Sequence, residues 1–278
     1  MNKQPSIIQV IKIFAHKLQK KGFSNAKNEL LWYLESLNID YKNDFYLNKI
    51  TVDSSLYSSI NEFYLKRKRG IPFQYIIQKG TFYGRDFFVN KHTLIPRPET
   101  ETIINQLKNS FFNDALEVGT GSGVLAITLS IENIAKKIIA TDISSKALSI
   151  ANKNKNFFKV SNIDFKKHDF LNQPINKKFD LIISNPPYIS LTEYNNLSLE
   201  IKNNEPLIAL TDNKDGLTFY LRFAQILHDI LKPGGVFLCE IGSPSVNEKI
   251  KQLFINKGYN IQIFKDLNCD ERILKITL

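Results

Sequence analysis

The feature that most constrains the fold is an apolar run that ends in two prolines. Residues 179–184 (FDLIIS) read as a strand that is buried on both faces of a sheet. Pro186 and Pro187 cannot continue a strand ladder, and Asn185, which precedes a proline, favours extended backbone. An amide and the ring of Tyr188 should therefore lie at the carboxyl end of a strand, where open α/β sheets bind ligands. This arrangement suits a planar polar nitrogen group.

Strand and helix patterns alternate from about residue 113 onward, which predicts a parallel sheet with helices on both faces. The expected strands are 115–118, 137–140, 162–167, 179–184, 236–241, 260–265 and 272–278. The expected helices begin at 124 and span 144–153, 217–230 and 246–257. The sequence therefore predicts one α/β domain in the second part of the chain.

Residues 1–75 instead carry apolar side chains at helical spacing, which predicts a small helical bundle. Four of them share one face of a first helix: Ile7, Ile11, Phe14 and Leu18. Ser24 or Asn25 can cap a second helix, and residues 53–55 a third that stops at Gly70. The basic run 66–69 ends this third helix. Such a run is typical of a solvated helix C-terminus; the alternative is a contact with phosphate or an acidic partner.

Between these regions, residues 71–90 are rich in Tyr, Phe, Val and Gly and predict short strands or a hairpin. Residues 94–101 (LIPRPETE) form a loop stiffened by two prolines that leads into a helix, whose first turn Glu99 and Glu101 would favour. This loop either separates two elements or forms a wall of a site.

Composition excludes several classes of protein. The chain has 278 residues, of which 43% are hydrophobic and 23% charged, as in globular domains. Its net charge of +10 is only weak support for a nucleic-acid or ribosomal partner. Two cysteines and four scattered histidines show no metal-ligand spacing, so no metal site is expected, and Cys239 and Cys269 are interpreted as buried. No run suits a membrane span or a secretory signal, so we expect a cytoplasmic protein.

A glycine-rich turn follows the expected strand 115–118. In this turn, Gly119, Gly121 and Gly123 alternate with Thr120 and Ser122. Because glycine has no Cβ, a ligand can lie against the backbone N–H groups there. The G-x-G-x-G spacing fits a nucleoside ligand better than a dinucleotide.

Asp142 ends the next strand, about 20 residues on, where an acidic side chain can accept ribose hydroxyls. The alternative is that Asp142 caps the helix at 144–153. Phe170 lies at the end of the third strand and would stack on an adenine, where Asp169 would help to satisfy polar atoms near the exocyclic amine. The alternative is that Phe170 is an ordinary core aromatic. His168 is interpreted as a partly exposed neighbour.

These motifs together resemble one family. Asn185-Pro186-Pro187-Tyr188 is similar to the signature of S-adenosyl-L-methionine-dependent methyltransferases that act on amino or amide nitrogens, and residues 117–123 resemble their cofactor loop, with Glu117 where Asp is commoner. The turn 231–235 (LKPGG) is similar to one widespread in class I methyltransferases. Residues 69–75 and 94–101 narrow the resemblance to the peptide chain release factor glutamine methyltransferases (HemK/PrmC). Residues 205–206, 215–217 and 270–272 also match that pattern.

The resemblance implies a class I, Rossmann-like methyltransferase with a seven-stranded sheet, an N-terminal helical bundle and a short β-hairpin linker. The implied domains are 1–75, which binds the substrate, a 76–100 linker with the hairpin, and a 101–278 methyltransferase domain. It also implies methylation of the glutamine side-chain nitrogen in the Gly-Gly-Gln motif of release factors, by a monomer that needs no nucleic acid. The cofactor S-adenosyl-L-methionine would be held by these residues: Gly119, Thr120, Gly121, Ser122, Gly123, Asp142, Phe170 and Asn185.

The acceptor glutamine would be held by residues 185–188. An amide nitrogen is a poor nucleophile because its lone pair is delocalised. The Asn185 side-chain oxygen and the Pro186 carbonyl would accept its two N–H hydrogens and orient it for transfer. That carbonyl is available because Pro187 cannot pair there as a strand residue would, and Tyr188 would pack against the amide plane. Two rival functions are an adenine-N6 nucleic-acid methyltransferase, which faces the same geometric problem, and a non-catalytic ribosome-associated binding protein.

Overall fold

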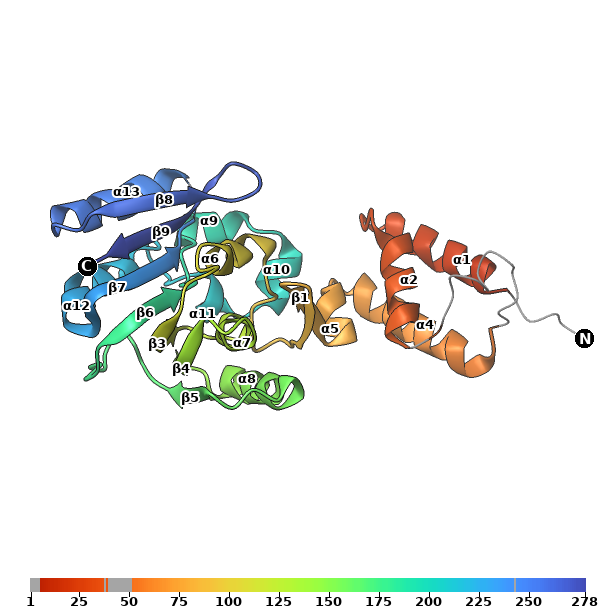
Figure 1. Ribbon diagram of the computed structural model, residues 1–278. Coiled ribbons are helices and arrows are strands. Elements are labelled where there is room, and N and C mark those ends of the chain that lie inside the picture. The colour runs from red at the N-terminus through yellow and green to blue at the C-terminus, as the bar shows by residue number, and fades with distance from the viewer. Residues whose placement is uncertain (1–5, 38, 40–51, 243) are drawn as a thin grey trace, which may run out of the picture. The chain divides into compact units, whose positions relative to one another are not determined.

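The chain divides into two compact units, Met1–Gln78 and Lys79–Leu278. The computed structural model describes residues 6–37, 39, 52–242 and 244–278 (Figure 1). Among these residues, no helix is both long enough and apolar enough to cross a bilayer.

The first unit is the expected helical bundle. Among its described residues, the helices are α1 (Ile7–Gln19), α2 (Ala26–Ser36), α4 (Ser54–Lys68) and α5 (Phe73–Ile77). Two of them start at capping residues: Ser6 accepts a hydrogen bond from the Gln9 N–H, and Asp53 accepts one from the Leu56 N–H. The apolar face predicted for α1 is buried in a common core with α2 and α4. Burial of these faces stabilises helices that would be marginal alone.

The basic run 66–69 has partners inside the first unit. Arg67 is buried, donates two hydrogen bonds to Glu29 (2.7 and 3.1 Å), and stacks over the Phe23 ring at 4.2 Å. Lys66 pairs with Glu62 one turn earlier on the helix. At least two of its four cations therefore stabilise the bundle, and the structure gives no reason to assign this run to phosphate binding.

The second unit is built on a seven-stranded sheet with the strand order β5-β4-β3-β6-β7-β9-β8. The strands are β3 (Phe112–Val118), β4 (Ala135–Asp142), β5 (Ile163–Lys167), β6 (Phe179–Ser184), β7 (Leu231–Glu240), β8 (Ile261–Lys265) and β9 (Glu271–Thr277). The first five in this order run parallel, and β9 is antiparallel to both β7 and β8. The chain runs from β3 through β4 to β5 and then returns to the other side of β3. The strand order thus reverses beside β3, the position at which such sheets bind ligands.

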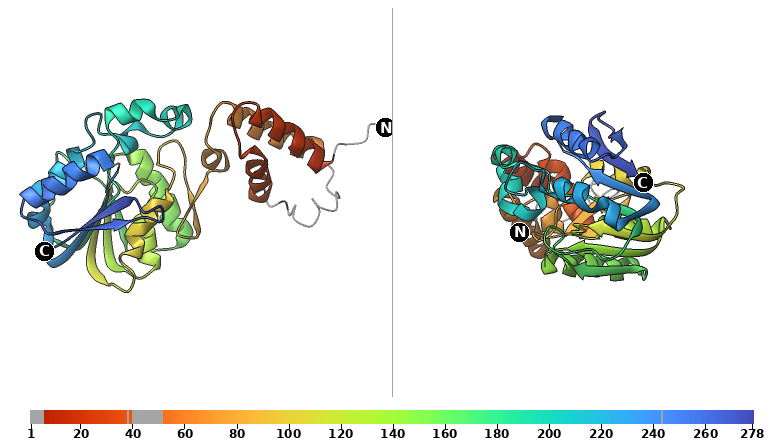
Figure 2. Two further views of the ribbon diagram at one scale, coloured as in Figure 1. Left: turned by 90° about the horizontal axis from the view of Figure 1, so that it is seen from above. Right: turned by 90° about the vertical axis from the view of Figure 1, so that its left-hand side faces the viewer.

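Helices cover both faces of this sheet (Figures 1 and 2). They are α6 (Glu101–Asn105), α7 (Val124–Ile131), α8 (Ser145–Phe158), α12 (Thr218–Ile230) and α13 (Pro244–Asn256). Residues 191–210 form three short helices that the sequence pattern does not predict: α9 (Leu191–Asn196), α10 (Leu199–Asn204) and α11 (Leu207–Leu210).

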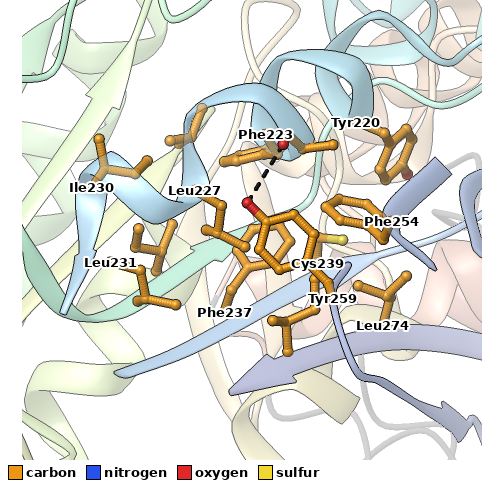
Figure 3. Close-up of a cluster of buried hydrophobic side chains, with 14 of the residues drawn as sticks. Tyr220, Phe223, Leu227, Ile230, Leu231, Phe237, Cys239, Phe254, Tyr259 and Leu274 are labelled. Carbon is orange, nitrogen blue, oxygen red and sulfur yellow. Dashed lines mark hydrogen bonds between the residues drawn. The ribbon is translucent and has the colours of Figure 1, made fainter. Parts of the chain in front are cut away.

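Alternate residues of the central strands enter two separate cores. Leu116 and Ile182 belong to the core shared with α12 and α13, whereas Ala115 and Leu181 belong to the core shared with α6 and α7. Figure 3 shows the first of these cores, in which aromatic rings from α12, α13 and β7 interlock. Tyr259 joins it and donates a hydrogen bond to the Ala224 carbonyl (3.4 Å). The strand 179–184 is therefore buried on both faces, as predicted.

The predicted hairpin consists of β1 (Lys79–Phe82) and β2 (Arg85–Phe88). Its two-residue turn, Tyr83-Gly84, has positive φ at both positions, which matches the twist of a tight hairpin. Phe82 and Phe87 are fully buried in the core that contains α6 and α7. The hairpin thus packs as part of the second unit.

Two expectations were wrong. Cys269 is exposed, in the turn between β8 and β9 with φ +66°, because the apolar pattern of β9 begins only after it; Cys239 is buried as expected. Strand β7 begins at Leu231, five residues before the expected start. Phe179 pairs with Leu231, and the register shifts before Leu181 pairs with Val236, so the turn 231–235 lies within the strand as an irregularity.

Candidate functional site

A cavity of about 330 Å³ opens at the carboxyl edge of the sheet in the second unit. The register explains its position. Val118 pairs with Thr141 on one side and with Ser184 on the other, so β3, β4 and β6 end level with one another. Gly119 and Asn185 follow β3 and β6, Asp142 is the last residue of β4, and all three line the cavity.

The three glycines of the turn after β3 all have positive φ, but the space around them differs. A Cβ at Gly121 would meet nothing within 4 Å, and one at Gly119 only the Asn185 carbonyl at 4.0 Å, so both positions face open space. A Cβ at Gly123 would lie 3.0–3.2 Å from Phe165, Ala151 and Ile127. Gly123 therefore permits the start of α7 to lie close to β5 and α8. Thr120 and Ser122 also line the cavity.

A buried carboxyl group supports this turn from below. Glu117 accepts hydrogen bonds from the Thr120 hydroxyl (2.7 Å) and from the Ala126 N–H (3.0 Å). Burial raises the pKa of Glu117 to about 8, against an ordinary value of 4.5. Asn154, also buried, donates to the Ser122 carbonyl (2.9 Å) and exchanges two hydrogen bonds with the Phe88 backbone. Asn154 thereby attaches the glycine-rich turn to the end of the hairpin.

Asp142 is tied to the same turn. Its carboxylate accepts hydrogen bonds from the Gly121 N–H and from the Ser144 N–H, each at 2.8 Å. Ser144, not Asp142, is the N-cap of α8, since its hydroxyl accepts the Ala147 N–H. The capping alternative for Asp142 is therefore wrong. Burial raises the pKa of Asp142 despite these bonds, and its carboxylate lines the cavity beside Ile143, an apolar side chain that is 42% exposed.

Phe170 lines the cavity and also belongs to the core. It lies parallel to Phe219 (centroids 5.9 Å apart) and against Phe223 (4.4 Å). The Asp169 carboxylate accepts local hydrogen bonds from Leu171 and Asn172, which lower its pKa. His168 is half-buried, as expected. Asp169 thus holds the turn in which Phe170 sits.

A chain of hydrogen bonds fixes Asn185. Its Nδ2 donates to the Thr100 hydroxyl (3.0 Å), and that hydroxyl donates to Oε2 of Glu240 (2.6 Å). Because the Thr100 proton is committed to a carboxylate, the Thr100 oxygen can only accept from Asn185. The atom of Asn185 that faces Thr100 is therefore the nitrogen, which leaves the side-chain oxygen to face elsewhere.

Tyr188 is hydrogen-bonded to the same carboxylate, that of Glu240. Its hydroxyl donates to Oε1 of Glu240 (3.1 Å), and burial raises the Tyr188 pKa. A Cβ at Gly242 would lie 2.5 Å from the Tyr188 ring, and a Cβ at Gly216 only 2.2 Å from the Tyr188 carbonyl oxygen. The absence of a side chain at Gly216 and Gly242 therefore allows the backbone at both positions to lie against Tyr188, which fixes the position of Tyr188. Pro187 lines the cavity as well.

The proline-rich loop forms a wall of the site. Leu94, Pro96, Arg97 and Thr100 line the large cavity. The loop is anchored by Glu205, which pairs with Arg97 (2.6 Å) and accepts the Ile95 N–H (3.2 Å). The short 3₁₀ helix Pro98–Thr100 then leads into α6. A second cavity, of about 150 Å³, shares Leu94, Arg97, Asn185 and Ala209 with the first.

Of the site residues predicted from the sequence, eight line the larger cavity: Gly119, Thr120, Gly121, Ser122, Asp142, Phe170, Asn185 and Pro187. Tyr188 lines the smaller cavity, and Gly123 and Pro186 line neither. The sequence pattern predicted no role for Thr100 and Ile143, which line the larger cavity, or for Glu240, which accepts the Thr100 hydrogen bond. Thr100 was part of a quoted motif without a role, and Glu240 sits inside an apolar strand. A carboxylate within the expected strand 236–241 was the signal that could have drawn attention to it. The described residues contain no group of three His, Cys, Asp or Glu side chains suited to a metal ion.

Comparisons with known proteins identify the fold and the family of the chain. The family model described as the methyltransferase small domain matches residues 98–201. A methyltransferase crystal structure from Pyrococcus furiosus superposes with a TM-score of 0.54 at 21% identity, over 71% of this chain and 90% of that one. This likeness supports the fold.

Relatives in sequence are closer. The release factor glutamine methyltransferase of Bacillus subtilis is 40% identical over 220 residues, which cover 74% of this chain and 75% of that protein. That of Clostridium acetobutylicum is 37% identical over 75% of each chain. The bifunctional methyltransferase of Rickettsia felis is 34% identical over 98% of this chain, which spans 58% of that longer protein. The chain therefore belongs to the release factor glutamine methyltransferase family, whose members are S-adenosyl-L-methionine-dependent enzymes.

Proposed function

We propose that this protein methylates the side-chain amide nitrogen of the glutamine in the Gly-Gly-Gln motif of peptide chain release factors, and so tunes translation termination. The names of its relatives support the choice of substrate. One structural observation carries the chemistry: the nitrogen of the Asn185 amide is committed to Thr100, so its oxygen is free to accept from a substrate NH₂ group.

The residues around the large cavity fit S-adenosyl-L-methionine, which supplies a sulfonium methyl group. Gly119 and Gly121 leave space against the backbone where a Cβ would project. The half-buried Asp142 carboxylate can accept ribose hydroxyls with its remaining lone pairs, and Ile143 and Phe170 offer apolar surface for an adenine.

The acceptor glutamine is assigned to the side of Asn185 that faces the smaller cavity. Asn185 lines both cavities, and Tyr188 lines only the smaller one. The Asn185 oxygen and the Pro186 carbonyl would accept the two N–H hydrogens of the substrate amide. These fixed acceptors orient the nitrogen and favour the positive charge that develops on it. Pro187 cannot pair as a strand residue would, so the chain leaves the sheet here and the Pro186 carbonyl is left available.

Nothing in the chain needs to remove a proton before transfer. The nearest carboxylate in the network, Glu240, accepts hydrogen bonds on both oxygens, from Thr100 and Tyr188, and is 1% exposed. The proton would leave the more acidic nitrogen after the methyl group has arrived.

The helical unit is proposed to bind the body of the release factor, in a cytoplasmic and monomeric enzyme that requires no nucleic acid. The linker and domain limits expected from the sequence, 76–100 and 101–278, remain part of this proposal.

Labelled S-adenosyl-L-methionine tests the function directly. The protein is incubated separately with a release factor, with the same factor carrying Gly-Gly-Ala in place of Gly-Gly-Gln, with duplex DNA and with RNA. We expect label only on the factor with the intact motif. Label on adenine in nucleic acid would instead favour an N6-methyltransferase, and no label on any acceptor would favour a non-catalytic binding protein.

A further inference from the structure

We propose that Glu240, acting through Thr100, is a positioning residue that sets which atom of the Asn185 amide is presented to the acceptor. This inference rests on the proposed function and adds to it a hydrogen-bond chain with a defined direction. The chain runs from Asn185 through Thr100 to Glu240, and Tyr188 closes it from the other side.

The direction of the chain is decided by the carboxylate. An ionised carboxylate only accepts, so Thr100 and Tyr188 must both donate to it. Thr100 has then used its single proton, and its oxygen must accept from the Asn185 nitrogen. The Asn185 oxygen is left as the acceptor that an incoming NH₂ group requires. Rotation of this amide by 180° would present a donor to a donor.

The same network is kept from exchanging with water. Glu240 and Thr100 are 1% and 3% exposed, and Asn185 is half-buried. Competing solvent molecules are therefore excluded from the Thr100–Glu240 contact, and a charge-assisted bond of 2.6 Å is strong in such surroundings. The orientation of Asn185 is thus fixed before the acceptor binds.

Protonation of Glu240 removes the constraint. A neutral carboxylic acid carries a proton of its own, which it can donate to Thr100, and the Thr100 hydroxyl is then free to donate to the Asn185 oxygen. Burial raises the pKa of Glu240 to about 7. Titratable and charged groups face it from each packed element: Tyr188, Arg272, Glu99, Tyr220 and Cys239. Among the charged ones, Arg272 favours the ionised form and Glu99 opposes it.

The experiment compares Thr100→Val with Thr102→Val. Thr102 is also a buried threonine, two residues away, but it does not line either cavity. With a release factor as acceptor, Thr100→Val should lower kcat about 10- to 100-fold, because a misdirected amide no longer orients the substrate. It should leave the Kd for S-adenosylhomocysteine within about threefold, and Thr100→Ser should restore most of the rate. Thr102→Val should match the wild type.

The pH profile supplies a readout that a purely structural role would not change. The wild-type kcat should fall as the pH decreases through about 7, as Glu240 becomes neutral. In Glu240→Gln this acid limb should disappear and kcat should stay low from pH 6 to pH 8.5. The side-chain amide resonances of Asn185, assigned by their absence from Asn185→Ala, should titrate in the wild type but not in Glu240→Gln.

Two outcomes would overturn the inference while the proposed function stands. One is a Thr100→Val enzyme as active as Thr102→Val, and the other is an unchanged acid limb in Glu240→Gln. If Thr100→Val does not fold, the Glu240→Gln profile and the Asn185 resonances decide alone. A wild-type enzyme that transfers no methyl group to the release factor would instead contradict the proposed function, and the resonance titration would still test the network.

Discussion

The two halves of the site are built in different ways. The half proposed to bind the cofactor, which we call the cofactor half, consists of residues 117–123 with Asp142. It is held by contacts between neighbouring strands and their connecting turns: Gly121 bonds to a residue 21 positions away and Thr120 to one only three away. The half proposed to bind the acceptor, which we call the acceptor half, consists of Asn185 and Tyr188 with Thr100 and Glu240. Its hydrogen bonds span 85, 52 and 140 positions. The first half is thus assembled locally and the second by the tertiary fold.

This difference predicts how substitutions in each half should affect binding and catalysis. A local turn made of backbone groups loses affinity when one support is removed, because the remaining groups still face the ligand. A chain of side chains has a single direction and fails as a unit. The cofactor half should therefore control Kd, and the acceptor half should control kcat.

The strongest test of this contrast is Asn185→Ala. Removing the amide takes away the acceptor that orients the substrate nitrogen, so kcat should fall about 1,000-fold, or about 4 kcal/mol in the activation free energy. The affinity for S-adenosylhomocysteine, measured by titration calorimetry, should change by no more than about threefold. Turnover close to the wild-type rate would remove Asn185 from the mechanism.

The corresponding test of the cofactor half is Asp142→Ala. The variant loses the carboxylate that holds the Gly121 and Ser144 N–H groups at 2.8 Å. We expect the Kd for S-adenosylhomocysteine to rise about 30-fold, equivalent to about 2 kcal/mol. At saturating cofactor, kcat should fall by less than about threefold. An unchanged Kd, or a loss confined to kcat, would break the division between the two halves.

Gly216→Ala probes the acceptor half through packing, with Gly234→Ala as the matched control. Both glycines have positive φ, +80° and +74°, so each substitution carries a backbone cost of about 1 kcal/mol. Only at Gly216 would the new Cβ meet the Tyr188 carbonyl, at 2.2 Å, whereas nothing lies within 4 Å at Gly234.

Gly216→Ala should therefore displace Tyr188, cost about 1–3 kcal/mol more than the control, and lower kcat about tenfold. Urea unfolding and initial rates measure the two effects. Equal stability and equal rates in the two variants would mean that Tyr188 tolerates displacement.

The smallest expected effect concerns stability and pH in the cofactor half. The pKa of Glu117 is raised from 4.5 to about 8 in the folded protein, so the folded state holds a proton that the unfolded state has lost between these values. The resulting stability is fully present below about pH 4.5 and is lost as the pH rises through about 8.

The wild-type Tm should therefore decrease between pH 5 and pH 9, and Glu117→Gln should flatten this decrease by a few degrees. Glu240 contributes a slope of the same sign up to about pH 7 and should remain in the variant. A variant whose Tm follows the wild-type slope would show that Glu117 is ionised in the folded state.

Many of the helices and strands, and much of the cofactor half, could be predicted because their signals are local. Strand β6 has the predicted bounds, and the helix at 217–230 differs from α12 by one residue. Short helices without apolar periodicity, α9 to α11, could not be predicted, and the local pattern could not place Cys269 outside β9. Patterns of burial specify an element only where one face meets the core.

The sequence by itself determined the buried strand, its stop at two prolines, and the placement of an amide beside a glycine turn, because backbone restriction and apolar period act between near neighbours. Only the tertiary structure decided which atom of that amide faces the acceptor. That choice depends on Thr100 and Glu240, which the sheet brings to Asn185 from distant parts of the chain, and the direction of a hydrogen bond is set by the partner that it meets.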